Sequence, residues 1–131
     1  MPEINRPRPK YLALHQIRLP LAGYASILHR VSGAGLFLML PLLIWLLQLS
    51  LGSSVESAAM FNAVMGNFLV KLILLGLLWA FLHHFCMGIR ILLLDIHVGV
   101  EKQQAYASAV AVMVVSLALT LILGLNLLGA Y

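Results

Sequence analysis

Three long apolar stretches, separated by short polar connections, dominate the pattern of the chain. They run from about residue 33 to 51, from 68 to 94 and from 107 to 128. Each is close to or above the roughly 20 residues that an α-helix, rising about 1.5 Å per residue, needs to cross a bilayer core about 30 Å thick. The alternating pattern of a transmembrane β-barrel is absent. We therefore predict a tail of residues 1–22 and one domain of residues 23–131, with membrane-spanning helices at approximately 23–51, 59–95 and 104–129.

The composition supports a membrane protein and argues against a nucleic-acid-binding one. Of the 131 residues, 63% are hydrophobic and 9% are charged, whereas about 25% of the residues in a typical soluble domain are charged. The net charge of +4 is not gathered on a basic face with base-reading side chains. We therefore predict an all-α integral membrane protein that contacts the lipid bilayer and has no nucleic-acid partner.

The basic residues predict how the chain is oriented in the membrane. Of the eight Lys and Arg residues, five precede the first apolar stretch: Arg6, Arg8, Lys10, Arg18 and Arg30. Because positively charged connections stay on the cytoplasmic side, we expect the N-terminus in the cytoplasm and the C-terminus in the periplasm. The first residues also lack the apolar core of a cleavable signal peptide. This favours a multi-pass protein of the bacterial inner membrane that is inserted through its own spans.

Polar residues gather where the first two spans meet the cytoplasmic face. The first span contributes Ser26, His29, Arg30 and Gly33, and the second contributes His84, Gly88, Arg90 and Asp95. Successive spans run in opposite directions, so the start of the first and the end of the second lie on the same side of the membrane. An ionisable side chain within a span costs about 2.5–3.5 kcal/mol on insertion scales. Such residues normally face the protein interior and mark a cofactor or a transport path.

His84 is the residue most suggestive of a cofactor. Gly88 lies one helical turn away and would leave room for the edge of a porphyrin, so His84 fits a haem ligand. An interhelical hydrogen bond is the alternative interpretation. Adjacent His83 points about 100° away from His84, so the two cannot ligate one haem from opposite faces. Ligation by two histidines would therefore require a partner chain.

The polar residues at the rim allow several roles. His29, Arg30 and Arg90 have the charge that haem propionates require, although each could instead be an interfacial residue, with Arg90 snorkelling to the headgroups. Ser26 and Arg30 could donate hydrogen bonds to the carbonyls of a quinone. Asp95 could relay protons from the cytoplasm or simply pair with Arg90.

Two motifs and a short element resemble a known family. The "RP" near the start, SILHRVSG at 26–33 and HFCMGIRILLLD at 84–95 resemble the cytochrome b556 membrane-anchor subunit of succinate dehydrogenase, respiratory complex II. The resemblance covers essentially the whole chain. It departs from the family at Ile91, where members often have a histidine. His83 also leaves the register of the ligand open, and Gly88, four residues after His84, favours His84 over His83.

The resemblance implies a fold, a cofactor and a set of partners. The chain would form half of a heterodimeric helix bundle with a second anchor subunit, and one haem b would be shared between an axial histidine of each chain. His84 stands at the ligand position, with Gly33 and Gly88 nearby. Ser26 and Arg30 match residues of the ubiquinone site, and His29 and Arg30 lie close to the propionates.

The implied function is that of an anchor that is not catalytic alone. Electrons from succinate would pass through a flavoprotein subunit and an iron–sulfur subunit on the cytoplasmic side, and reduce ubiquinone in two one-electron steps. Ser26 and Arg30 would polarise the quinone carbonyls, and the haem would hold an electron nearby. The alternatives are the anchor of a fumarate reductase that oxidises menaquinol, and a small non-redox transporter or scaffold that uses Arg30 and His84 as buried polar contacts.

Overall fold

The computed structural model describes residues 16–129, so most of the tail expected at residues 1–22 lies outside the described residues. The described chain contains four helices and no strand: α1 (Leu21–Leu51), α2 (Val55–Gly66), α3 (Phe68–Asp95) and α4 (Lys102–Leu128). Helices α1, α3 and α4 are long and apolar enough to cross a membrane, with a mean hydropathy of 2.1, 2.0 and 2.5 over their most apolar windows. The prediction of an all-α protein with three membrane-spanning helices is confirmed.

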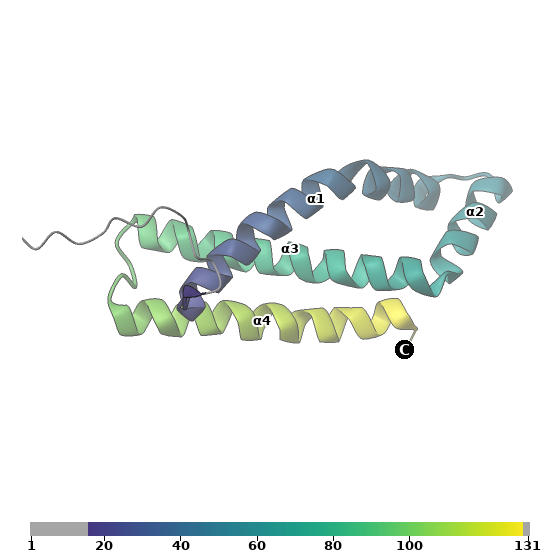
Figure 1. Ribbon diagram of the computed structural model, residues 1–131. Coiled ribbons are helices and arrows are strands. Elements are labelled where there is room, and N and C mark those ends of the chain that lie inside the picture. Colours follow the sequence, from purple (N-terminus) through teal and green to yellow (C-terminus); the bar gives the residue numbers. More distant parts are fainter. Residues whose placement is uncertain (1–15, 130–131) are drawn as a thin grey trace, which may run out of the picture.

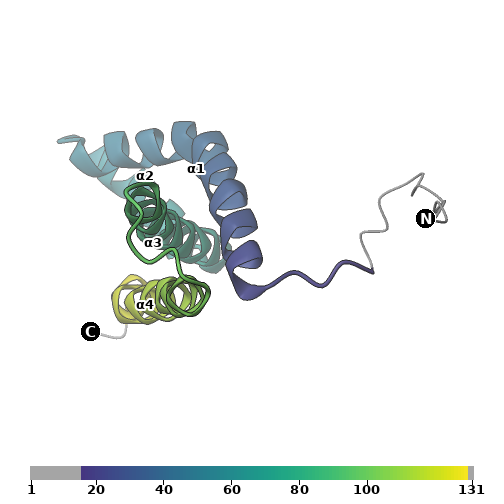
Figure 2. The same cartoon turned by 90° about the vertical axis from the view of Figure 1, so that its left-hand side faces the viewer.

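The three long helices pack so that one end of the bundle collects the start of α1, the end of α3 and the start of α4. Figure 1 shows α3 and α4 side by side and antiparallel, with α1 crossing them obliquely. The view along α3 and α4 in Figure 2 shows the first turns of α1 reaching both helices, while its later turns lie away from α4. In Figure 1 these later turns also diverge from α3, and α2 spans the gap between the end of α1 and the start of α3. Residues of α1 near position 30 and of α3 near position 84 are thereby brought together.

The second span differs from its predicted boundaries. The sequence predicts one helix over 59–95, but residues 55–66 form the separate helix α2, and α3 begins only at Phe68. Asn67 separates them: its backbone is extended, with φ −77° and ψ 121°, and its Oδ1 accepts a hydrogen bond from the Leu69 N–H at 2.9 Å. An asparagine that satisfies the free N–H groups of a new helix favours a helix start at this point. Hydropathy does not register such a local hydrogen bond.

The core is made of small side chains and a few larger ones. Ala25, Met87 and Val112 form its apolar centre, one from each long helix. Small or β-branched residues recur along the buried face of α4: Ala109, Val112, Ser116, Thr120 and Gly124. A Cβ at Gly124 would collide with the side chain of Leu75. This close approach of α3 and α4 is typical of helices in membranes, where contact between backbones replaces the hydrophobic effect as the source of stability.

Candidate functional site

His84 is held against α1 by one of its two ring nitrogens. Nδ1 lies 3.0 Å from the carbonyl oxygen of His29 and 3.3 Å from Oγ of Ser32. A carbonyl oxygen can only accept, so Nδ1 is the donor, and in the neutral imidazole Nε2 then carries the lone pair. Nε2 has no hydrogen-bond partner within residues 16–129. Histidines that bind metals commonly have their other nitrogen fixed to a carbonyl in this way, so Nε2 of half-buried His84 is available as a ligand.

Glycines border the imidazole of His84 and explain why it lies so close to α1. A Cβ at Gly33 would stand 2.7 Å from Cε1 and 3.2 Å from Nδ1 of His84, so a side chain at this position would displace the ring. The group that comes closest to Gly33 from another helix is therefore His84 itself. At Gly88 a Cβ would meet only Nε2 of His29, at 4.0 Å. Gly88 therefore leaves open space next to the same histidine pair.

His29 covers one side of His84. The two rings are stacked, with centroids 4.1 Å apart and an angle of 14° between their planes. The carbonyl of His29 also accepts a hydrogen bond from Ser32 Oγ at 2.9 Å. The backbone of His29 therefore orients His84 while its side chain packs on it. Ser32, which is buried here, was not singled out from the sequence; its position three residues after His29 was the only signal.

His83 has different surroundings from its neighbour. It is fully buried, with its Nε2 3.3 Å from the carbonyl oxygen of Ala25 and its ring 5.4 Å from the indole of Trp79. Its Nδ1 is buried and has no partner within the described part of the chain. Because His83 faces the interior of its own subunit, His84 is the one of these two adjacent histidines that presents a ring nitrogen to a group outside the chain.

Ser26 and Arg30 lie one turn apart on α1, near the same end of the bundle. Ser26 is half-buried and Arg30 is exposed. Neither side chain has a hydrogen-bond or ion-pair partner among the residues that the structure describes. The hydroxyl and the guanidinium are therefore both free to bind a ligand at this rim.

Arg90 has a structural role within the subunit. It is 8% exposed, and its Nε donates to Ser108 Oγ at 3.0 Å while Nη2 donates to the carbonyl of Ala105 at 3.0 Å. The guanidinium thus ties α3 to the start of α4. The alternative in which it snorkels to the headgroups is wrong for this reason. The suggested pair with Asp95 is also absent: Asp95 is exposed and forms no ion pair within residues 16–129.

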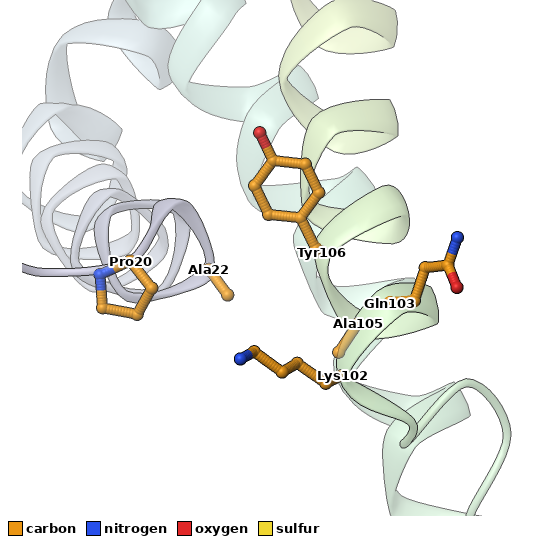
Figure 3. A pocket seen from close by; sticks show the side chains of 6 residues that line it. All are labelled: Pro20, Ala22, Lys102, Gln103, Ala105 and Tyr106. Carbon is orange, nitrogen blue, oxygen red and sulfur yellow. The ribbon is translucent and has the colours of Figure 1, made fainter.

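A cavity of about 590 Å³ opens at the same end of the bundle, between the first residues of α1 and of α4. Its lining residues are shown in Figure 3: Pro20, Ala22, Lys102, Gln103, Ala105 and Tyr106. Ala22 lies four residues before Ser26 and shares its face of α1. The rim therefore has an apolar recess one helical turn from Ser26. The sequence did not predict it, because it is built from two helix ends about 80 residues apart in the chain.

The comparisons with known proteins agree with the motifs. The family model described as the succinate dehydrogenase/fumarate reductase transmembrane subunit matches residues 4–123. The chain is 35% identical over 104 residues to the succinate dehydrogenase cytochrome b556 subunit of Paracoccus denitrificans, which covers 79% of this chain and 78% of the relative. It is 34% identical over 93 residues to the subunit of the same name from Coxiella burnetii, covering 71% and 74%, and 32% identical over 97 residues to that of Rickettsia felis, covering 74% of each.

The matched region contains all of α1, α2 and α3 and most of α4, including both motifs and the whole contact between His84 and α1. The resemblance inferred from the two motifs is thereby confirmed over the part of the chain that carries the polar site. With its three apolar helices, the chain is a multi-pass bacterial membrane protein and a non-catalytic membrane subunit. It belongs to the succinate dehydrogenase/fumarate reductase transmembrane subunit family.

Proposed function

We propose that this subunit anchors a succinate dehydrogenase in the membrane, binds one haem b together with a second anchor subunit, and forms part of the site at which ubiquinone is reduced. The observation that carries the proposal is the state of His84: Nδ1 is fixed to the His29 carbonyl and Nε2 is free. The name cytochrome b556, borne by the similar bacterial subunits, supports a haem. The flavoprotein and iron–sulfur subunits would dock at the end of the bundle that carries Ser26.

The residues of this chain fit a haem b. His84 would be one ligand of the haem iron through Nε2, because its hydrogen-bonded Nδ1 orients the ring and raises the basicity of the other nitrogen. Gly33 allows His84 its present position, and Gly88 offers open space beside it. His83 is enclosed in the core, so a second histidine ligand would come from the partner anchor. Arg30, exposed at the rim with His29 beside it, has the charge to bind a propionate. When bound, haem b supplies a one-electron carrier beside the quinone site.

Ser26 and Arg30 would act directly on the quinone. The Ser26 hydroxyl and the Arg30 guanidinium would donate hydrogen bonds to its carbonyl oxygens and stabilise the negative charge that develops there during reduction. Two electrons from succinate and two protons from the cytoplasm complete the conversion to the quinol. Asp95, exposed at the end of α3 without an ion pair in the described residues, is the carboxylate of this chain that would relay protons.

These roles require the N-terminus to face the cytoplasm and the C-terminus to face the periplasm. The charge distribution supports this orientation. Arg18, Arg30 and Lys102 lie at the end that carries the site, while the opposite end of the described chain has Lys71 and Glu56. An excess of basic residues on the cytoplasmic side is the usual pattern of bacterial membrane proteins.

The test is a reduced-minus-oxidised absorption spectrum of the purified complex with His84→Ala. The expected result is the loss of the b-type band, because the variant lacks the free Nε2. The matched control is His97→Asn, which replaces an exposed histidine of the α3–α4 connection that has a left-handed backbone, φ 64°. A b-type band that persists unchanged in His84→Ala refutes the ligand assignment. If the complex with the original sequence also shows no b-type band, the result favours a non-redox scaffold.

A second candidate is the membrane anchor of a fumarate reductase that oxidises menaquinol, since the matching family includes both enzymes. The two functions are separated by the quinone used. The purified complex is assayed with succinate and a ubiquinone analogue, and with a menaquinol analogue and fumarate. Faster turnover in the second assay would favour the fumarate reductase.

A further inference from the structure

Two adjacent histidines of α3 bind two successive turns of α1. His83 Nε2 lies 3.3 Å from the carbonyl oxygen of Ala25, and His84 Nδ1 lies 3.0 Å from that of His29. Residues four apart lie one above the other on a helix, so these two carbonyls are on the same face of α1. Ser26 directly follows Ala25, and Arg30 directly follows His29. Each contact therefore holds the backbone beside one residue of the proposed quinone site.

The contact of His83 is closed off from everything outside the subunit. His83 and Ala25 are both 0% exposed, and Met87 packs beside them at 1%. Because the Ala25 carbonyl only accepts, Nε2 of His83 is the donor. Nδ1 is then an acceptor without a partner in the described residues. A buried polar atom without a partner is unfavourable, and an apolar ring would fill the space without that cost. Compared with an apolar ring in the same space, His83 contributes one favourable interaction, the hydrogen bond to the Ala25 carbonyl.

Apart from the packing around Ala25, few contacts hold the first turns of α1. The residue that precedes α1, Pro20, forms no side-chain cap, and the first turn contains no acidic residue and includes Gly23. Within the described chain, the bond from His83 is the side-chain hydrogen bond that reaches the segment 21–28 from another helix. The position of Ser26 relative to α3 therefore depends on packing around Ala25 and on this bond.

We propose that His83 is a positioning residue of the quinone site. By donating from Nε2 to the Ala25 carbonyl it holds the turn of α1 that carries Ser26 against α3, so that the Ser26 hydroxyl keeps a fixed position relative to His84. His83 does not touch the quinone or the haem. The inference rests on the proposed function, because it assigns His83 to the same site.

The test uses the intact complex in membranes, with succinate and a short-chain ubiquinone analogue. His83→Leu keeps apolar volume but removes the donor, and we expect the KM for the quinone to rise by about two- to tenfold, the range of one hydrogen bond. Reduction of an artificial dye by succinate and the b-type band should not change. His83→Gln, whose amide nitrogen takes the place of Nε2, should restore the KM. His83→Asn, whose amide nitrogen corresponds to Nδ1, should not. Equal KM values for Gln and Asn overturn the proposal, even if the leucine variant fails to assemble.

A double substitution separates positioning from general stability. If His83 acts through Ser26, then Ser26→Ala combined with His83→Leu should have the same quinone KM as Ser26→Ala alone, because coupled residues are not additive. Additive effects would overturn the positioning role. A normal KM in His83→Leu with a raised KM in Ser26→Ala overturns this inference alone. A normal KM in Ser26→Ala overturns the quinone role of Ser26 and the inference with it.

Discussion

Substitution of Gly33 by alanine is the sharpest test of the site geometry. The new Cβ would stand 2.7 Å from Cε1 and 3.2 Å from Nδ1 of His84, well inside the roughly 3.5–4.0 Å at which carbon atoms make their best contact. The ring would have to move by about an ångström to restore such a contact. It is held in place by the 3.0 Å bond to the His29 carbonyl and by stacking on the His29 ring. The displacement therefore breaks the hydrogen bond that orients Nε2.

The expected cost combines two terms. Overpacking in a close-packed interior costs about 1–3 kcal/mol, and the lost hydrogen bond adds about 0.5–1.5 kcal/mol. The preference of a helix for alanine over glycine offsets about 0.5–1 kcal/mol of this cost. We expect Gly33→Ala to lower the haem content per complex and the melting temperature of the purified complex. Both are measured on the same sample, by the reduced-minus-oxidised spectrum and by thermal denaturation.

Gly35→Ala is the matched control for this prediction. Gly35 lies on the same helix, and a Cβ there would meet no atom within 4 Å. Alanine is favoured over glycine by about 0.5–1 kcal/mol within a helix, so this variant should keep its haem and be at least as stable as the original. Gly33→Ala with the same spectrum and melting temperature as Gly35→Ala would refute the reasoning, since it would show that His84 does not depend on this contact.

Three further predictions concern Arg90, Gly124 and Arg30. Arg90→Leu should destabilise the purified complex by about 1–2 kcal/mol, the size of interhelical hydrogen bonds in membranes, because it removes the bonds from α3 to α4; an unchanged melting temperature would contradict this. Gly124→Ala should also lower the melting temperature, and Leu75→Ala should rescue it by removing the colliding side chain; absence of rescue would show that another neighbour limits the space. Arg30→Lys should slow succinate–quinone reduction while succinate–dye reduction persists, because lysine lacks the planar fork of donors; equal loss of both would indicate failed assembly.

The break at Asn67 shows where hydropathy stops being informative. The residues on either side of it are largely apolar, so the pattern extends the second span back to residue 59. The helix nevertheless restarts at Phe68, because one side-chain oxygen caps the Leu69 N–H. A hydrogen bond to the backbone two residues away is worth about 1 kcal/mol at a helix start, and it leaves no trace in a hydrophobicity average.

By itself, the sequence determined the class of protein and the residues of interest. Apolar runs of about 20 residues have only one stable form across a membrane, since lipid cannot satisfy backbone polar groups, so the three long helices were predictable. The motifs at 26–33 and 84–95 identified the family, and the antiparallel order of successive spans placed both motifs at one end of the bundle.

Only the tertiary structure decided which face of each helix meets which neighbour. The angle of about 100° between successive residues separates His83 from His84, but the rotation of α3 against α1 decides that His83 is enclosed and His84 keeps a free nitrogen. The same rotation directs Arg90 to α4 rather than to Asp95, and brings His84 against Gly33. These outcomes depend on how closely small residues let helices approach and at what angle they cross. In lipid that packing supplies much of the association energy, and it joins residues more than fifty positions apart, which no local pattern encodes.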